Sequence, residues 1–449
     1  MKRRITTILF FCVCATFTLA ARDFVITRYG ARPDTTQLST KAIQRAIDKC
    51  AKSGGGRVVI PAGKFKTGSI FLKSNTCLWL EPGATLYGST DITDYTPVKP
   101  EILSLRTHVP TIQLIYCEKA TNVSIGGYGT IDGRGIGFKK KILDGTDEGI
   151  ARPHLIRFVE CRNVTVTDVS LRNSACWMQH YLACDSVKIH AVKVFNRNNH
   201  NNDGLDLDGC HDVTVSNCII DSDDDGIVLK STSPRACENI NVTECIVSSH
   251  CNAIKLGTES NGGFRNINIS ECVVMPSADQ SSRYFGLERG ISTISLEMVD
   301  GGVLENVNVS NIMAYGTESP IFIRLGRRNR PYAENIPVTT TGILRNVCLS
   351  NITIAGAGAT GCSISGVQGM CVQDVTLRDI FIEMKGGVEE VIPLPADEKE
   401  TGYPEAIIWG KLPAKGFMLR HTRNVKFENV LISTHSPDTR PDFIYDDTE

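Results

Sequence analysis

Residues 239–269 read NINVTECIVSSHCNAIKLGTESNGGFRNINI, and this stretch decides the fold. It opens and closes on one phrase: a polar residue, usually Asn, then Val or Ile, a polar residue, and Val or Ile again. Alternation of apolar and polar residues over so short a span is typical of a β-strand with one buried face. The phrase returns after 27 residues, and a period of about 20–30 residues indicates a solenoid of stacked coils.

The same phrase recurs along most of the chain. Copies begin at positions 163, 186, 212, 239, 266, 306, 346, 374 and 424, with a weaker copy at 122. No segment between the copies has convincing helical periodicity, which excludes leucine-rich and ankyrin-type repeats. We therefore predict an all-β, right-handed parallel β-helix, in which each coil has about three short strands and neighbouring coils lie roughly 4.8 Å apart.

Two further features of the repeat have structural consequences. The recurrent Asn should form a ladder of side-chain amides that bond from coil to coil in a turn. The widest spacings between copies indicate inserted loops, and loops on one side of a solenoid usually build a binding cleft. These loops are expected at 276–291, 327–341 and 386–416.

The N-terminal region differs from the repeats. Residues Ser39 to Cys50, STKAIQRAIDKC, are the best helix candidate, because their apolar positions share one face. A short capping helix is needed there, since an open solenoid end would expose its core. No linker divides the chain, so we predict a single β-helix domain over residues 21–449.

Residues 1–20 have the features of a secretory signal peptide. Lys2-Arg3-Arg4 is a basic start, the next residues are mostly apolar but too few to span a bilayer, and Thr18-Leu19-Ala20 offers a cleavage site. This predicts a periplasmic or extracellular protein. Two of the 17 cysteines, Cys12 and Cys14, lie in this leader. The others mostly occupy repeat positions that Val or Ile fills elsewhere, so we expect mainly free thiols, although neighbouring coils could bring some close enough to bridge.

Composition excludes several classes of partner. The formal net charge is −1, so no overall field favours nucleic acid or an acidic membrane surface. No segment after the leader is apolar enough for a membrane helix, and we expect a monomer.

Three acidic residues stand in aligned copies of the repeat. Residues 202–207, NDGLDL, align with 224–229, DDGIVL, and with 251–256, CNAIKL. If each copy is one coil, Asp203, Asp224 and Asp225 converge on one patch, which packing does not require but acid–base chemistry does. The alternatives are a turn ladder or a calcium site. Residues 221–226 match the opening of an EF-hand loop, but its twelfth position is Thr232 and no helices flank it, so we expect no metal.

Several motifs together resemble glycoside hydrolase family 28, the polygalacturonase family, over most of the mature length. They are the helix at 42–48 followed by GGG at 54–56, the GTIDGRG strand at 129–135, NNDG at 201–204 and DDG at 224–226. The resemblance implies a pectin-lyase-like solenoid and hydrolysis of α-linked galacturonate with inversion. It implies that Asp224 is the general acid, that Asp203 and Asp225 hold and deprotonate the water, and that no cofactor is needed.

The chain also departs from the family pattern. The histidine of the family's Gly-His-Gly falls on Asn252, and the carboxylate-gripping Arg-Ile-Lys falls near Thr293-Ile294-Ser295, which has no cation. We therefore expect a rhamnogalacturonan-type pectic polysaccharide or oligosaccharide rather than plain homogalacturonan. The replacement cation is expected to be Lys255, Arg324 or the Arg420-His421 pair. The predicted substrate contacts are Asn202, Asn252, Lys255, His200, His180, Arg324 and Trp177, the last by stacking on a sugar.

Two other functions remain open from the sequence. A pectate-lyase-like enzyme on the same solenoid would eliminate rather than hydrolyse, and would need calcium and a strong base. A non-catalytic carbohydrate-binding solenoid, such as an adhesin, would bind glycan without cutting it. Clustered carboxylates argue against a binder of an anionic polymer, since they would repel it.

Overall fold

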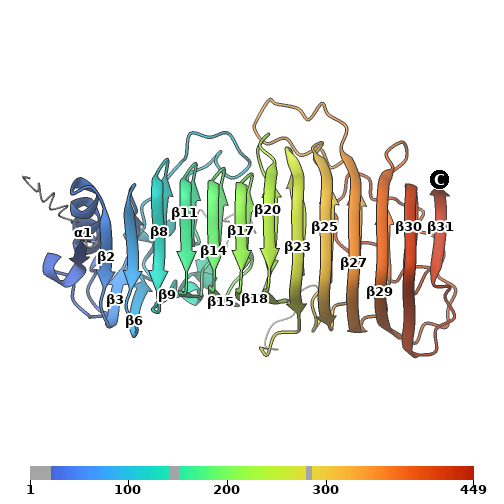
Figure 1. Ribbon diagram of the computed structural model, residues 1–449, viewed down its shortest axis with the longest axis horizontal. Coiled ribbons are helices and arrows are strands. Elements are labelled where there is room, and N and C mark those ends of the chain that lie inside the picture. The colour runs from blue at the N-terminus through green and yellow to red at the C-terminus, as the bar shows by residue number, and fades with distance from the viewer. Residues whose placement is uncertain (1–21, 142–150, 280–285) are drawn as a thin grey trace, which may run out of the picture.

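The computed structural model describes residues 22–141, 151–279 and 286–449. Within these ranges 31 strands form one parallel sheet that winds along a single axis (Figure 1). The predicted parallel β-helix is therefore confirmed. The predicted signal peptide at 1–20 lies outside the described residues, and in the described ranges no helix is long and apolar enough to cross a membrane.

Each coil contributes one strand to each of three faces, and every face is a stack of parallel pairs. The first face contains β4 (Ile70–Phe71), β7 (Gln113–Glu118), β10 (His154–Val159), β13 (Gln179–Leu182), β16 (Leu205–Asp208), β19 (Ile227–Ser231), β22 (Asn252–Ser260), β24 (Ser292–Met298), β26 (Ile321–Leu325), β28 (Cys362–Ser365) and β31 (Phe443–Thr448). The second contains β1 (Asp23–Val25), β2 (Gly56–Ile60), β5 (Thr76–Leu80), β8 (Thr121–Gly127), β11 (Arg162–Thr167), β14 (Asp185–His190), β17 (His211–Ser216) and β20 (Cys237–Thr243).

The third face follows the same order. It contains β3 (Gly63–Thr67), β6 (Ala84–Gly88), β9 (Thr130–Asp132), β12 (Ser170–Arg172), β15 (Lys193–Asn196), β18 (Ile219–Ser222) and β21 (Ile246–Ser249). Beyond this point long bent strands serve the second and third faces together: β23 (Gly263–Val274), β25 (Val303–Tyr315), β27 (Ile343–Ala357) and β29 (Val372–Gly386). The last of them, β30 (Phe417–Ser436), also pairs with β28 on the first face.

The asparagine ladder lies near the start of the second-face strands, with Asn239 in β20 and the following asparagines in β23, β25 and β27. Nδ2 of Asn266 donates to Oδ1 of Asn239 at 3.1 Å, Asn306 donates to Asn266 at 3.0 Å, and Asn346 donates to Asn306 at 2.7 Å. All four residues have a φ between 53° and 58°. Asn tolerates this left-handed conformation better than most residues and bonds along the stack, so the phrase specifies both the turn and the register.

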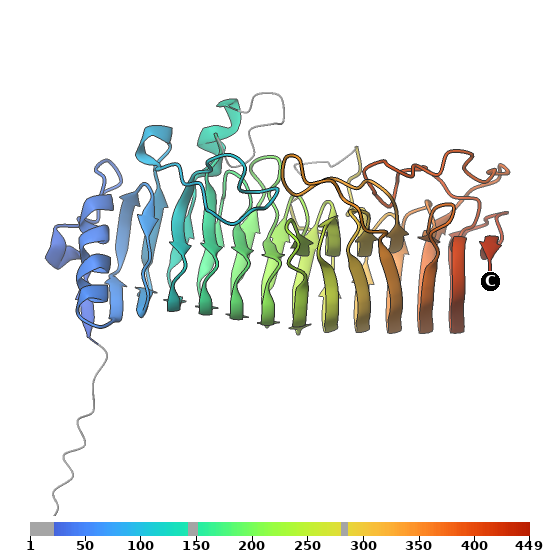
Figure 2. The same cartoon turned by 90° about the horizontal axis from the view of Figure 1, so that it is seen from above.

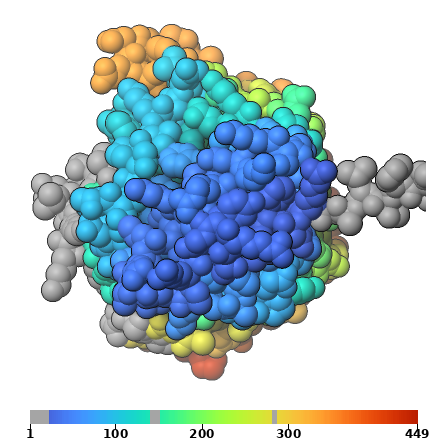
Figure 3. All heavy atoms as spheres, turned by 90° about the vertical axis from the view of Figure 1, so that its left-hand side faces the viewer, coloured from blue at the N-terminus to red at the C-terminus, as the bar shows by residue number. Residues whose placement is uncertain are grey.

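The capping helix is confirmed. Helix α1 spans Thr40–Lys52 and buries Ala42, Ile43, Ala46, Ile47 and Cys50. With the first strands it covers the N-terminal end of the solenoid (Figure 3). Short 3₁₀ turns lie at η1 (Ile26–Tyr29), η2 (Ile92–Asp94) and η3 (Gly135–Lys141).

The cysteines of the described residues, from Cys50 to Cys371, are thiols rather than disulfides. Cys161, Cys184, Cys210 and Cys237 are buried in the apolar core, as are Cys218, Cys245 and Cys272, whose position Ile312 fills on the next coil. The expectation of thiols used as small apolar residues is therefore confirmed.

Loops gather on one side of the solenoid, as Figure 2 shows. Two of the expected insertions lie between β26 and β27 and between β29 and β30, at 326–342 and 387–416. A third, long connection at 89–112 joins β6 to β7. The repeat spacing did not predict it, because it precedes the first recognisable copy of the phrase. These three loops approach the first face.

Candidate active site

The three aligned copies lie on successive coils at the start of the first face. Leu205 pairs with Ile227, and Ile227 with Ile254, which is the predicted register. The N–H of Gly204 donates to the carbonyl of Asp225 at 2.9 Å, and the N–H of Gly226 donates to that of Asn252 at 2.8 Å. Vertical stacking therefore brings together acidic residues that are distant along the chain.

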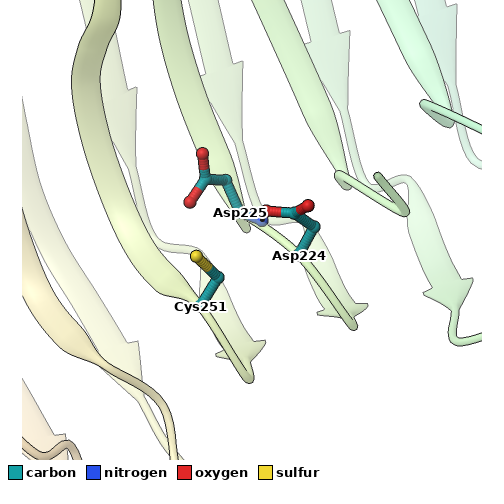
Figure 4. A group of neighbouring side chains, drawn as sticks. All are labelled: Asp224, Asp225 and Cys251. Atoms are coloured by element: carbon teal, nitrogen blue, oxygen red, sulfur yellow. Dashed lines mark hydrogen bonds between the residues drawn. The ribbon is translucent and has the colours of Figure 1, made fainter. Parts of the chain in front are cut away.

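The acidic side chains are buried but accessible to different degrees. Asp203 and Asp225 are each 3% exposed, whereas Asp224 is 8% exposed. Asp224 and Asp225 extend from one turn, with Cys251 on the next coil (Figure 4). Oδ1 of Asp224 accepts the N–H of Asp225 at 2.9 Å. Of the three acids, Asp224 is therefore the one best placed to meet a ligand.

Asp224, Asp225 and Cys251 form a possible metal-ligand group, with ligand atoms within 4.8 Å of one another. Calcium prefers oxygen ligands, and a thiol is a poor substitute. Burial raises the pKa of Cys251 well above its usual value, so the neutral thiol rather than the thiolate is favoured. The thiol therefore makes this group a poor fit for calcium.

Lys255 and Asn252 both contact Asp225. Lys255 Nζ lies 3.1 Å from Asp225 Oδ2, and Asn252 Nδ2 donates to Asp225 Oδ1 at 2.9 Å. Burial alone would raise the pKa of Asp225, but Lys255, Lys230 and the Asn252 amide together hold it below its usual value. Asp225 is therefore ionised and suited to act as a base. Asn252 and Lys255 lie at the acidic site, as expected.

Lys230 is a central residue that the sequence analysis missed. Its Nζ lies 3.5 Å from Asp203 Oδ2 and 3.6 Å from Asp206 Oδ1. The sequence feature that could have identified it is a lysine on the outward-facing side of the strand that follows DDG at 224–226. Burial and the charges of Asp206 and Asp224 nonetheless raise the pKa of Asp203 well above its usual value, because Lys230 offsets them only in part.

Trp177 and His180 are buried on the coil that precedes Asp203, and neither is exposed in an open cleft. Trp177 is 2% exposed, and Arg106 and Lys230 lie over its ring at 4.5 and 4.8 Å from the centroid. This corrects the expectation that Trp177 stacks on a sugar, because the cations of Arg106 and Lys230 already cover its ring. His180 Nε2 lies 3.1 Å from Asp208 Oδ2, and burial lowers the pKa of His180 to about 4. A neutral His180 therefore positions Asp208.

The remaining predicted contacts have other roles in the structure. Asn202 is fully buried: its Oδ1 accepts the N–H of Asn198 at 2.7 Å and its Nδ2 donates to the Ser174 carbonyl at 3.0 Å, so it shapes the turn before Asp203. His200 is exposed in that turn.

Arg324 does not reach the acids. It is 2% exposed and donates to the carbonyls of Gly366, at 2.8 Å, and of Glu398, at 2.6 Å. Its observed role is to anchor the loop at 387–416. Arg420 likewise binds Asp446 and the carbonyl of Pro395.

The loop at 387–416 supplies two residues that sequence reasoning missed. Lys255 Nζ lies 3.5 Å from Tyr403 Oη, and Cys251 Sγ lies 3.9 Å from Glu405 Oε2. Burial raises the pKa of Glu405 to about 8 against the opposing charge of Lys255. This loop therefore covers the lysine that holds Asp225 ionised. A loop without periodicity gave no sequence signal for this contact.

Two named relatives match part of the chain. A probable polygalacturonase of Vitis vinifera is 31% identical over 212 residues, which cover 45% of this chain and 43% of the relative. An exo-poly-alpha-D-galacturonosidase of Dickeya chrysanthemi is 32% identical over 266 residues, which cover 48% of this chain and 43% of the relative. The matches thus span less than half the length of these relatives.

Solved structures match along almost the whole chain. The hyperthermoactive exopolygalacturonase from Thermotoga maritima superposes with a TM-score of 0.72 at 24% identity, covering 92% of both chains. The family 28 exopolygalacturonase from Yersinia enterocolitica superposes with a TM-score of 0.75 at 18% identity, covering 96% of this chain and 78% of the other. At these identities the likeness establishes the fold. The sequence profile of glycosyl hydrolases family 28 matches residues 50–394, which include the three aligned copies at 202–207, 224–229 and 251–256, and the chain belongs to that family.

Proposed function

We propose that this protein hydrolyses α-linked galacturonate bonds in pectic polysaccharide or oligosaccharide, with inversion at the anomeric carbon. The observation that carries the proposal is that the surroundings shift the pKa values of two neighbouring carboxyl groups in opposite directions. The pKa of Asp225 is held low, mainly by Lys255 against the effect of burial, and that of Asp203 is raised by burial, Asp206 and Asp224. A pair of carboxyl groups with separated pKa values is what acid–base cleavage of a glycosidic bond needs.

The roles follow from charge and exposure. Burial and the charges of Asp206 and Asp224 favour the protonated form of Asp203, so a proton is held beside Asp224. Asp224 is the more exposed of the two and donates that proton to the glycosidic oxygen as the bond breaks. Water attacks the anomeric carbon from the opposite side. Asp203 holds this water, and the ionised Asp225 accepts its proton.

The stereochemistry needs a direct measurement. Asp224 and Asp225 have ligand oxygens within 4.8 Å, closer than the roughly 6.5–9.5 Å usual between the acid and base of inverting enzymes. Proton NMR during the first minutes of hydrolysis distinguishes the outcomes. A β-configured reducing end supports inversion of the α-linkage, and an α-configured one contradicts it.

Within this substrate class we propose a rhamnogalacturonan-type chain. The support is that Thr293 and Ser295 replace the family's two cations, and that Ser295 Oγ donates to Glu297 Oε1 at 2.7 Å. The test is digestion of a panel of pectic oligosaccharides, with products identified by mass spectrometry. Cleavage of plain oligogalacturonate in preference to rhamnose-containing substrates would reject this preference but keep the hydrolase.

Elimination is the weaker alternative, because a lyase needs a neutral strong base. Burial disfavours charge on Lys255 and Lys230, but the surrounding carboxylates raise the pKa of both well above the usual value, so both stay protonated. New reducing ends without ultraviolet-absorbing unsaturated product, in the presence of a chelator, would support hydrolysis. Glycan binding with no new reducing ends would indicate a non-catalytic solenoid.

We also propose that residues 1–20 direct export to the periplasm or the extracellular space and that the mature protein is a monomer. Support for export is the basic and then apolar order of these residues. N-terminal sequencing of the secreted protein tests the cleavage site, and light scattering tests the oligomeric state.

A further inference from the structure

Cations from separate parts of the chain converge on Glu259, near the end of β22. Arg106, from the loop at 89–112, places Nη2 2.9 Å from Glu259 Oε1. Arg330, from the loop at 326–342, places Nη1 3.9 Å from the same oxygen. Lys230 Nζ lies 3.9 Å from Glu259 Oε2. We call Arg106, Arg328, Arg330, Glu259 and Asp300 the arginine cluster.

The arginine cluster directly adjoins the catalytic acids. The ammonium group of Lys230 lies within 4 Å of both Glu259 and Asp203, so one side chain links the two groups. Arg106 also lies over the buried ring of Trp177, as Lys230 does, which fixes the position of the guanidinium group. A substrate at Asp224 would therefore extend toward these arginines.

Two carboxylates, Glu259 and Asp300, hold the guanidinium groups of the arginine cluster. Arg328 binds Asp300 through Nε at 2.9 Å and through Nη2, and the backbone N–H of Arg330 donates to Asp300 at 3.0 Å. Three guanidinium groups thus surround two carboxylates. Although burial raises the pKa of Glu259, Arg106 and Lys230 hold it below its usual value, so Glu259 is already ionised.

Two of the guanidinium groups are reachable by a ligand. The Arg330 side chain is 47% exposed and that of Arg106 is 20% exposed, whereas Arg328 is nearly buried against Asp300. The buried carboxylate of Glu259 needs a cation for stability, and Arg106 supplies one at 2.9 Å, so the half-exposed Arg330, at 3.9 Å, is not needed for that purpose alone. Guanidinium groups bind carboxylates in a planar, two-bonded geometry.

We propose that Arg106 and Arg330 together bind the carboxylate of a galacturonate unit next to the bond that is cleaved. This inference rests on the proposed function and supplies the cationic grip that Thr293 and Ser295 lack. Lys255 does not fill that role, since it is engaged by Asp225. The partly exposed side chains of Arg106 and Arg330 supply the donors for the uronate carboxylate.

The test compares a charged substrate with its neutral counterpart. Trigalacturonate and its fully methyl-esterified form are assayed with wild type, Arg330→Ala and Arg330→Lys. Loss of one charge-assisted contact should raise KM for trigalacturonate about 10- to 100-fold and leave KM for the ester unchanged. Arg330→Lys should recover part of the loss. An equal effect on both substrates, or no effect, would overturn the inference.

Arg345→Ala is the matched control. Arg345 is also half-exposed and also bound to a glutamate, Glu305, but it lies on the second face. Its removal should change neither KM. Thermal melting of each variant verifies folding. Because the Arg330 side chain is half-exposed, we expect Arg330→Ala to fold.

A binding measurement separates this inference from the proposed function. Calorimetric titration of trigalacturonate into Asp224→Asn, with and without Arg330→Ala, needs no turnover. Binding that weakens at least about tenfold with Arg330→Ala supports the arginine cluster even if wild type hydrolyses nothing, in which case only the hydrolase proposal fails. Equal binding by the two variants, or none by either, rejects the cluster whatever the activity.

Discussion

Lys255 Nζ and Asp225 Oδ2 form a buried ion pair 3.1 Å apart at the centre of the first face. Burial of one charge without the other would be costly, so the pair has to be formed as a unit. The same contact that stabilises the buried charges also keeps Asp225 ionised, as its proposed role as the base requires. Structural stability and base strength are therefore coupled at this position.

Replacing Lys255 with Met should affect both properties. Removal of the cation raises the pKa of Asp225, so the acidic limb of the kcat/KM profile moves to higher pH. Breaking the buried pair should also lower the free energy of unfolding by about 3–5 kcal/mol. Lys255→Arg keeps the charge and should keep the limb close to its original position. An unshifted profile in Lys255→Met would show that Asp225 is not the titrating base.

Replacing Asp224 with Asn should remove nearly all turnover while leaving melting and sugar binding close to wild type. An amide cannot donate the required proton, and loss of general acid catalysis costs about 10²–10⁴-fold or more in rate. The neighbouring Asp223 is the matched control, because His250 Nδ1 lies 2.8 Å from its Oδ1 and Arg197 binds it too. Asp223→Asn should retain far more activity. The reverse ranking in reducing-end assays would shift the site by one residue.

Replacing Glu405 with Gln should change how stability depends on pH. The folded protein holds the Glu405 proton up to about pH 8, mainly through burial, whereas an unfolded chain releases it near pH 4.5. Stability contributed by this proton is complete below the unfolded pKa and is lost as pH rises toward the folded value. Between pH 5 and 8 the wild type should therefore lose more than about 1 kcal/mol relative to Glu405→Gln.

Urea denaturation at several pH values measures the effect at Glu405. Glu428→Gln, an exposed position on β30, serves as the control and should show no such divergence. Parallel pH profiles for wild type and Glu405→Gln would mean that the loop at 387–416 leaves Glu405 solvated.

Replacing Asn266 with Ala should destabilise the fold in two ways. It removes the bonds to Asn239 and Asn306, at 3.1 and 3.0 Å, and it forces a β-carbon residue without a compensating amide into a φ of 56°. The expected loss is about 1–3 kcal/mol. Asn266→Gly relieves the backbone strain but still lacks the amide, so it should lose less. Chemical denaturation that ranks Gly below Ala would contradict this account of the ladder.

The sequence by itself determined the solenoid, its register and the three acids. The polar–Val–polar–Val phrase combines strand alternation with a residue that accepts a left-handed turn, so each copy specifies a strand and where it starts. Since identical turns stack vertically, alignment of residues 202–207 with 224–229 was enough to place Asp203 above Asp225. Local signals repeated at a fixed period carry this information without any knowledge of distant contacts.

Only the tertiary structure decided what surrounds those acids. Lys230 reaches Asp203 across a coil, Trp177 is covered by Arg106, and Arg324 turns to a loop carbonyl instead of the cleft. The contacts of Arg106 and Arg324 join the ordered stack to loops of irregular sequence, and no period relates those two contacts. The packing of such loops depends on which charges and apolar faces they meet after the solenoid has formed, so the acids follow from the sequence and the cations that tune them follow from the fold.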